Sequence, residues 1–304
     1  MTTPADSTEV ENTETTGIAA RRRDLGNGFV VRRVLPSPLR RMVGPFAFVD
    51  HMGPVELQPG MGMDVRPHPH IGLSTVTFLF DGEVVHRDSL GIDQVIRPGD
   101  VNWMTAGSGI VHSERSPAAT RKTGSRVHGM QLWVALPTAS EEISASFQHH
   151  PAATIPSLQQ PGARLCTIAG SAYGLVSPVA THSPLFYVEA RLDAGARLQL
   201  PDEYAGRAAY VVDGTISCDG KPYAEGVMAV FRPGPAQIVA LTASRVMLLG
   251  GAVLDGERHI WWNFVSSSQA RIDAAAAAWR TREFPAIPGD DQEFIPLPDE
   301  GAGH

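Results

Sequence analysis

The chain has 304 residues, of which 43% are hydrophobic, and a formal net charge of -7 at pH 7. A chain of this length buries one large core or two moderate ones, and two domains of about 130 to 150 residues are the better expectation. The acidic balance argues against a general nucleic-acid-binding or anionic-membrane surface, which would need a basic excess. We therefore expect no direct nucleic-acid partner.

The N-terminal residues 1–16 are rich in Thr, Glu and Ser, so we expect a disordered tail there. Neither an apolar secretion-signal core nor a run of about 18 apolar residues is found, which predicts no membrane association and a cytoplasmic location. Cys166 and Cys218 are far apart and form no CxxC pair, so neither a zinc site nor a disulfide framework is indicated.

The segment from Arg21 to Arg41 holds seven arginines and one acidic residue, Asp24. Its VVRRV and LRRMV patterns are typical of solvated strand edges, and we interpret it in this way rather than as a basic patch.

From about residue 17 to 265 the sequence predicts β structure. Short β-branched or aromatic runs such as FVVRRV, STVTFLF and MQLWVAL are separated by Gly, Pro and Asp-Gly turns. TFLFDGEVVHRD, followed by IRPGD, is echoed later by AYVVDGTISCDG, followed by FRPGP. Each copy has a strand, an Asp-Gly hairpin, a second strand and an Arg-Pro-Gly turn, which indicates two copies of one β module.

A helix is expected late in the chain. Ser266 and Gln269 have the spacing of a capping box, and Ile272, Ala276 and Trp279 share one face of the Ala-rich segment that follows. The proline-rich tail beyond it is expected to pack through a few apolar residues, namely Phe294, Ile295 and Leu297.

Two segments carry candidate metal ligands. RPHPHIGLSTVTFLFDG contains His68 and His70, and RPGDVNWMTAGSGIVHSE ends with His112 and Glu114. In a strand, residues i and i+2 point to the same face, so each pair presents two ligands side by side. If the two strands are neighbours in a barrel interior, three imidazoles and one carboxylate converge.

This ligand set narrows the choice of metal without settling it. Because thiolates are lacking and nitrogen predominates, iron–sulfur clusters are excluded and calcium and magnesium are disfavoured, which leaves Fe, Mn, Co, Ni, Cu and Zn. Four protein ligands leave two positions of an octahedral ion open to substrate and dioxygen, whereas a closed tetrahedral zinc site would suit a structural role.

The same residues resemble known motifs. The G-x5-H-x-H pattern of Gly62, His68 and His70 and the G-x-x-H pattern of Gly109 and His112 resemble the two cupin motifs. The strings GPFAFVDHMGP, HPH-x-G, HRDSLG, PGDVNWMTAGSGIVHSE and QLWVALP resemble the pirin family within the cupins. This resemblance covers the chain from about residue 20 to the EFIPLP string near its end.

The resemblance implies an all-β bicupin, with two stacked antiparallel β-barrels or jelly rolls and a C-terminal helix. It implies one ion in the N-terminal barrel, expected to be Fe(II) with Mn, Co, Ni, Cu and Zn left open, held by His68, His70, His112 and Glu114. Alignment of the Asp81 and Asp213 turns places Leu200 and Asp202 where the first barrel has His68 and His70, so we expect the second barrel to be empty.

The expected domain organisation has five parts. They are a disordered tail (1–16), an N-terminal metal-binding cupin domain (17–140), a linker (141–180), a C-terminal cupin domain without metal (181–265) and a C-terminal helix with its tail (266–304).

The function that the resemblance implies is that of an iron-dependent quercetin 2,3-dioxygenase (quercetinase), an oxidoreductase acting on a small aromatic or flavonol-like substrate. Glu114 is then the candidate catalytic residue, a ligand that also carries a proton. The alternative is a non-enzymatic protein whose metal senses redox state and which acts through a protein partner. Whether the chain is an enzyme is left open.

The chain departs from the family pattern after its second histidine. Many pirins read HPHRGFE, whereas this chain reads HPHIGLS, with Ile71 in place of the arginine and Ser74 in place of the glutamate. Strand alternation predicts that Ser74 faces the same way as His70 and lies near the metal. A carboxylate that could act as a base would then be missing.

The other histidines are expected to stay off the metal: His86, His149 and His150, with His51 and His128 nearest to the cavity. Five apolar residues are candidates either for lining the pocket or for plain barrel packing: Met63, Phe78, Phe80, Trp103 and Met104.

Overall fold

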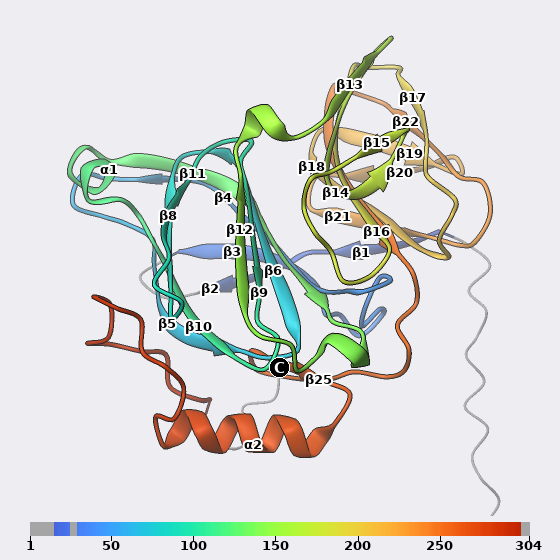
Figure 1. Ribbon diagram of the computed structural model, residues 1–304. Helices are drawn as coiled ribbons and strands as arrows, with labels where there is room; N and C mark the ends of the chain where they lie inside the picture. The colour runs from blue at the N-terminus through green and yellow to red at the C-terminus, as the bar shows by residue number, and fades with distance from the viewer. Residues whose placement is uncertain (1–14, 25–28, 299–304) are drawn as a thin grey trace, which may run out of the picture.

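In the computed structural model, which describes residues 15–24 and 29–298, two antiparallel β-barrels stand side by side and one long helix lies beneath the first (Figure 1). The all-β architecture of two barrels with a C-terminal helix is thereby confirmed. The expected disordered tail falls mainly on residues 1–14, which lie outside the described residues.

The first barrel consists of two sheets. Its seven-stranded sheet contains β2 (Arg21–Asp24), β3 (Val30–Leu35), β4 (Phe46–Leu57), β6 (Leu73–Asp81), β9 (Val101–Thr105), β11 (Ser125–Ala135) and β12 (Ser146–His150), in the order β12-β9-β6-β11-β4-β3-β2. The opposite sheet, called the histidine sheet below, contains β5 (Asp64–His70), β7 (Val84–Asp88), β8 (Asp93–Ile96) and β10 (Ile110–Arg115), in the order β5-β10-β7-β8. A short helix, α1 (Ala118–Thr123), precedes β11.

The second barrel repeats this plan. Its larger sheet contains β1 (Thr16–Ala19), β13 (Ser157–Gln160), β14 (Ala163–Ala172), β15 (Leu175–Val176), β16 (Leu185–Leu192), β18 (Gly206–Asp213), β21 (Val227–Phe231) and β23 (Ser244–Gly251). Its smaller sheet contains β17 (Arg197–Gln199), β19 (Thr215–Cys218), β20 (Lys221–Ala224) and β22 (Gln237–Ala240). Two short 3-10 helices, η1 (Thr138–Ser140) and η2 (Ala152–Thr154), lie on either side of β12.

The barrels exchange chain at the N-terminus. β1 pairs with β21 of the second barrel, and Figure 1 shows this blue strand on the side of the yellow and orange strands. β2 returns to the first barrel, where its four exposed residues form the edge beside β3. Arg21, Arg22 and Arg23 therefore lie on a solvated strand edge. The VVRRV pattern forms β3 instead, which lies between β2 and β4 with Arg32 and Arg33 half-buried, so the edge interpretation is wrong for that pattern.

The internal repeat is visible as two matching hairpins. Asp81 and Gly82 connect β6 to β7, and Asp213 and Gly214 connect β18 to β19. Both glycines have a positive φ, 85° and 82° respectively, a conformation that side-chain-bearing residues rarely adopt. The Asp-Gly signal in the sequence therefore marks the same turn in both copies.

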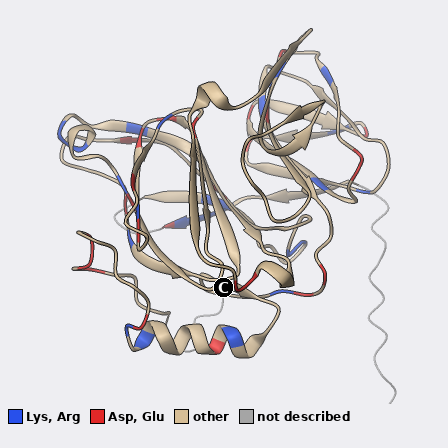
Figure 2. Cartoon of the chain, in the orientation of Figure 1, with Lys and Arg blue, Asp and Glu red and all other residues tan. Residues whose placement is uncertain are grey.

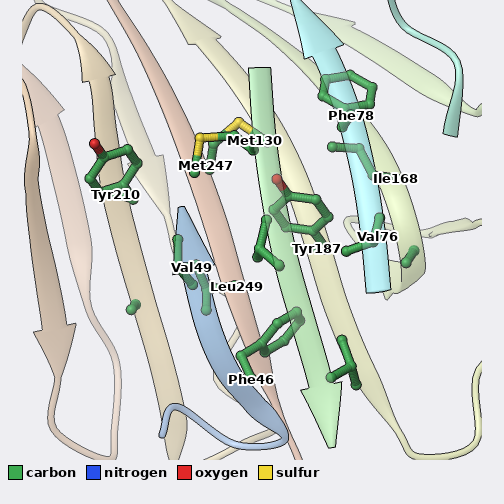
Figure 3. Packing of buried hydrophobic residues seen from close by; sticks show 14 of the residues in the cluster. Phe46, Val49, Val76, Phe78, Met130, Ile168, Tyr187, Tyr210, Met247 and Leu249 are labelled. Carbon is green, nitrogen blue, oxygen red and sulfur yellow. The ribbon is translucent and has the colours of Figure 1, made fainter. Parts of the chain in front are cut away.

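The two barrels are held together by an apolar layer between their large sheets (Figure 3). The first barrel contributes the outer face of its seven-stranded sheet, including Phe46, Val49, Val76, Phe78 and Met130. The second contributes Ile168, Tyr187, Tyr210, Met247 and Leu249. Because residues of one strand alternate between faces, this layer fixes which residues of the first barrel point inward.

The interior of the second barrel is filled by apolar side chains. Leu200, Ile216 and Leu248 belong to its core, together with the Cys218 thiol. Leu200, which was aligned with His68, is 2% exposed and packs in this cluster.

After the second barrel the chain returns to the first. β24 (His259–Trp261) and β25 (Phe264–Ser266) form a hairpin, and α2 (Gln269–Arg280) follows along the base of the first barrel (Figure 1). The predicted apolar face of α2 is confirmed, since Ile272, Ala276 and Trp279 are buried.

The capping-box prediction is wrong. The N-cap of α2 is Ser268, without a side-chain hydrogen bond, and the Ser266 hydroxyl instead donates to Glu141. The buried Glu141 pairs with Arg258 and accepts hydrogen bonds from the Ser267 backbone and hydroxyl, which draws Ser266 away from the helix.

The tail beyond α2 packs against the first barrel, as expected. The Ile295 N–H donates to the carbonyl of Pro67 in β5, and the Trp279 indole donates to the Ile295 carbonyl. The Phe294 ring meets Trp279 edge to face, and Leu297 packs in the same cluster.

Charged residues of both signs lie around the periphery, and the strands at the centre of the view carry few of them (Figure 2). Within the described residues, no helix has the length and apolar character needed to cross a membrane.

Candidate metal centre

Three histidines meet on the inner face of the histidine sheet. His68 and His70 lie on β5, and His112 lies opposite His68 on the adjacent strand β10. Their ligand nitrogens all lie within 4.8 Å of one another, and all three side chains are buried. The expected neighbouring strands are thus found, and alternation turns Ser113 outward, where its hydroxyl donates to Asp290.

Backbone carbonyls orient two of these rings. His68 Nδ1 lies 2.8 Å from the Arg66 carbonyl, and His70 Nδ1 lies 2.9 Å from the Asn263 carbonyl. Because a carbonyl can only accept, both Nδ1 atoms carry the proton and both Nε2 atoms keep a free lone pair. His70 is held by a carbonyl of the β24–β25 hairpin, so the returning chain takes part in the site.

The donor set fits a transition-metal ion. His70 Nε2 and His112 Nε2 are 3.1 Å apart. Two nitrogens bound at right angles to one ion at 2.0–2.1 Å would be about 3 Å apart. Burial lowers the pKa of His68 to about 4, and it lowers the pKa of His70 and His112 well below the usual value, with neighbouring histidines adding to the effect. The rings are therefore neutral at pH 7, as metal ligands must be.

Glu114 lies beside the histidines and outside their group. It faces the barrel interior, where its Oε1 accepts from Thr77 at 3.1 Å and its Oε2 accepts from Gln131 at 2.6 Å. Both donors belong to the seven-stranded sheet, so Glu114 joins the two sheets across the barrel. Its role as a fourth ligand stays a prediction.

Aromatic rings stand next to the site. Trp133 meets the edge of His70 at a centroid distance of 5.1 Å and stacks on Phe48 at 4.1 Å. Phe147 stacks on His86 at 4.5 Å. No sequence pattern predicted a role for Phe48, Trp133 or Phe147, because they lie on β4, β11 and β12, outside the two segments that carry the histidines.

His86 comes closer to the site than expected. It lies on β7, opposite Glu114 of β10, and its Nδ1 is 3.4 Å from His112 Nδ1. It is not a member of the three-histidine group, so it contacts a candidate ligand instead of acting as one. His149 lies on β12 and hydrogen-bonds to Asn102.

The expectation that His51 and His128 lie nearest to the cavity is wrong. Both lie on the outer face of the seven-stranded sheet, where His51 contacts Tyr210 of the second barrel and the two Nε2 atoms are 2.8 Å apart. Phe80 stands edge-on to both rings. These side chains belong to the contact between the barrels.

Three of the five candidate lining residues lie on the outer face of the seven-stranded sheet, toward the second barrel, and do not line the interior. Phe78 and Trp103 lie in the layer between the barrels, and Phe80 packs against it. Met104 packs with Ile110, the partner of His70, and Met63 lies in an apolar cluster with Met52 and Leu79.

The prediction that Ser74 faces the metal is also wrong. Its hydroxyl bonds to Thr105 at 3.0 Å, and alternation along β6 places it with Val76 and Phe78, opposite to Thr77. The reason is the turn at Gly72, with φ of 66°, which ends β5 and moves the chain into the other sheet. Alternation does not continue through such a turn.

The other departure, Ile71, lies 1% exposed beneath α2 in the cluster of Val111 and Phe264. It therefore packs on the outer side of the histidine sheet.

Comparison with known proteins agrees with this architecture. The pirin family model matches residues 28–134, and the model of the pirin C-terminal cupin domain matches residues 187–285. A pirin-like protein of Caulobacter vibrioides is 54% identical, with 92% of this chain and 98% of that protein covered.

Two further relatives carry a dioxygenase name. A Pseudomonas aeruginosa protein named "Putative quercetin 2,3-dioxygenase" is 39% identical, with 92% of this chain and 90% of that protein covered. The crystal structure of a quercetin 2,3-dioxygenase from Acinetobacter baumannii superposes with a TM-score of 0.88 at 33% identity, covering 97% of this chain and 98% of that one. The chain belongs to the pirin family of bicupin proteins.

Proposed function

We propose that this protein is a metal-dependent dioxygenase of the quercetin 2,3-dioxygenase type, with iron as its ion and a flavonol-like substrate. The observation that supports this most is the buried three-histidine group, whose geometry fits one transition-metal ion. The 39% identity to the Pseudomonas relative and the superposition on the Acinetobacter enzyme support the same reaction class.

A redox-capable ion bound here would supply open coordination positions for the adjacent oxygens of the substrate and would activate it toward dioxygen. The chain's own part is to hold the three imidazoles neutral and oriented in a buried interior. Glu114 lies two residues after His112 on β10, and we assign to it both ligation and acceptance of the substrate's hydroxyl proton. Thr77 and Gln131 fix its two oxygens from the opposite sheet.

Trp133 and Phe48 give the interior an aromatic wall beside His70. Aromatic side chains of this kind suit stacking or edge contacts with the rings of a flavonol. Since Ser74 points away from the interior, the expectation that it weakens base catalysis loses its basis.

The test is oxygen uptake by protein loaded with Fe(II) and given quercetin. We expect one dioxygen consumed per quercetin, and loss of that uptake in His70→Ala. His182→Ala, on the segment before β16, is the matched control and should behave as wild type. If metal-loaded protein leaves a panel of flavonols unchanged, the enzymatic proposal fails, and the alternative of a redox-sensing regulator with a protein partner gains support.

A further inference from the structure

A chain of hydrogen bonds runs from His112 to a buried carboxylate. His112 Nδ1 lies 3.4 Å from His86 Nδ1, and His86 Nε2 lies 3.0 Å from Asp88 Oδ2. His86 is 4% exposed and Asp88 is fully buried. All three residues lie on the inner face of two adjacent strands, with Asp88 directly opposite His112.

The direction of this chain can be read from Asp88. Its Oδ1 accepts the backbone N–H groups of Leu90 at 2.9 Å and Ile92 at 3.2 Å, and its Oδ2 faces His86. Because a carboxylate accepts, His86 donates through Nε2, and in the neutral imidazole Nδ1 then keeps a lone pair. His112 then donates its Nδ1 proton to His86.

This order of donors leaves His112 Nε2 without a proton. It then matches His68 and His70, whose Nδ1 atoms donate to carbonyls. The Nε2 atoms of His70 and His112 face each other at 3.1 Å with two lone pairs, an arrangement that a cation between them stabilises. Phe147 stacks on the His86 ring and limits its rotation.

We propose that His86 and Asp88 are positioning residues for the metal: Asp88 fixes the tautomer of His86, and His86 fixes the tautomer and orientation of His112. Ligating histidines usually donate their second N–H to a carboxylate, carbonyl or water. Here the acceptor is a second histidine, which is itself set by a carboxylate. The inference rests on the metal-binding part of the proposed function and is independent of the substrate.

Asp88→Asn tests the direction of the chain with almost no change in shape. The Leu90 and Ile92 N–H groups still need the side-chain oxygen, so the new amide N–H groups face His86 Nε2. His86 must then carry its proton on Nδ1, which faces His112 Nδ1 and drives the His112 proton to Nε2. We expect Co(II) and Zn(II) affinities, measured by chelator competition on the full chain, to fall roughly 10- to 100-fold.

Asp93→Asn is the matched control, because Asp93 lies on the neighbouring strand β8 with an exposed side chain paired to Arg87. It should bind both metals as wild type does. Unchanged affinity in Asp88→Asn would overturn the proposal.

A second measurement does not depend on the variant folding. Nitrogen-15 NMR of the wild-type, zinc-loaded chain should show His86 protonated at Nε2 and accepting at Nδ1. A proton on His86 Nδ1 would contradict the proposal. Neither readout uses quercetin, so a protein that binds metal in this way and fails to oxidise flavonols would refute the proposed function alone.

Discussion

Glu114 projects from the same face of β10 as His112, and both of its oxygens accept hydrogen bonds from the opposite sheet. Each carboxylate oxygen has a further lone pair, so these bonds leave Glu114 able to contact an ion. A carboxylate fixed in this way loses little freedom when it ligates.

We predict that Glu114→Gln lowers Fe(II) or Co(II) affinity by more than roughly tenfold, because the replacement keeps the shape and removes the anionic ligand. Chelator competition measures it. Glu142→Gln, at an exposed carboxylate paired with Arg271, is the control and should leave affinity unchanged. Full affinity in Glu114→Gln would mean that Glu114 is not a ligand.

We predict that His112→Ala removes metal binding while the fold is kept. The apolar layer between the barrels and the apolar interior of the second barrel support the fold, so folding does not depend on the ion as it does in a zinc finger. By elemental analysis, the metal content should fall from about one ion per chain in wild type to near zero in the variant. The melting temperatures of the two metal-free proteins should be similar. More than one ion per wild-type chain, or a variant that does not fold, would contradict this.

At the scale of elements, hydrogen bonds connect the outer face of the histidine sheet to the C-terminal tail beyond α2. Arg115, on β10, donates two hydrogen bonds of 2.8 Å to Asp290, which also accepts from Ser113. Burial alone would raise the pKa of Asp290, but the hydrogen bonds and charge of Arg115 hold it below the usual value. The strand that carries His112 is thus tied to the tail beyond α2.

We predict that Asp290→Asn destabilises the protein by about 1–3 kcal/mol at pH 7, because Arg115 loses a two-point partner in a partly buried place. Since the folded-state pKa of Asp290 is lowered, its contribution is present above the unfolded value near 4 and is lost as the pH falls below it. Urea unfolding should show that the difference in free energy of unfolding between wild type and Asp290→Asn is smaller at pH 3 than at pH 7. Asp291→Asn is the control, and an equal loss there would refute the role of Asp290.

Side-chain directions within a single strand could be predicted from the sequence. Contacts made by segments that are distant in the sequence could not. His68, His70 and His112 could be found because i, i+2 spacing holds inside β5 and β10. Ser74 was misplaced because the Gly72 turn restarts the alternation in another sheet. The Asn263 carbonyl that orients His70 could not be anticipated, since it lies 193 residues away and only the return of the chain brings it there.

For the whole molecule, the contact between the barrels contains a polar cluster within an apolar layer. His51 of the first barrel contacts Tyr210 of the second at 2.9 Å, and it faces His128 at 2.8 Å. Arg32 lies 3.2 Å from His51 and pairs with the second barrel's Glu225. These polar side chains connect the barrels across their shared face.

Both histidines of this cluster resist protonation. Burial lowers the pKa of His51, and Arg32, His128 and Arg245 lower it further. Burial also lowers the pKa of His128 to about 4, with Arg245, Arg126 and Arg32 adding to the effect and Asp81 opposing it. The charges that face the pair are thus mainly positive.

We predict that the free energy of unfolding falls as the pH drops from about 6.5 toward 4. In that window the unfolded chain binds protons that the folded pair does not, and each such histidine contributes a slope of about 1.4 kcal/mol per pH unit. His128→Gln keeps a hydrogen-bonding side chain beside His51 and removes one titrating group, so its pH slope should be shallower than that of wild type. His150→Gln, on the half-buried end of β12, should change the slope less. The measurement is urea unfolding at half-unit pH steps, which gives the free energy of unfolding as a function of pH. Parallel curves for wild type and His128→Gln would show that proton exclusion at the contact between the barrels does not control the acid stability of the molecule.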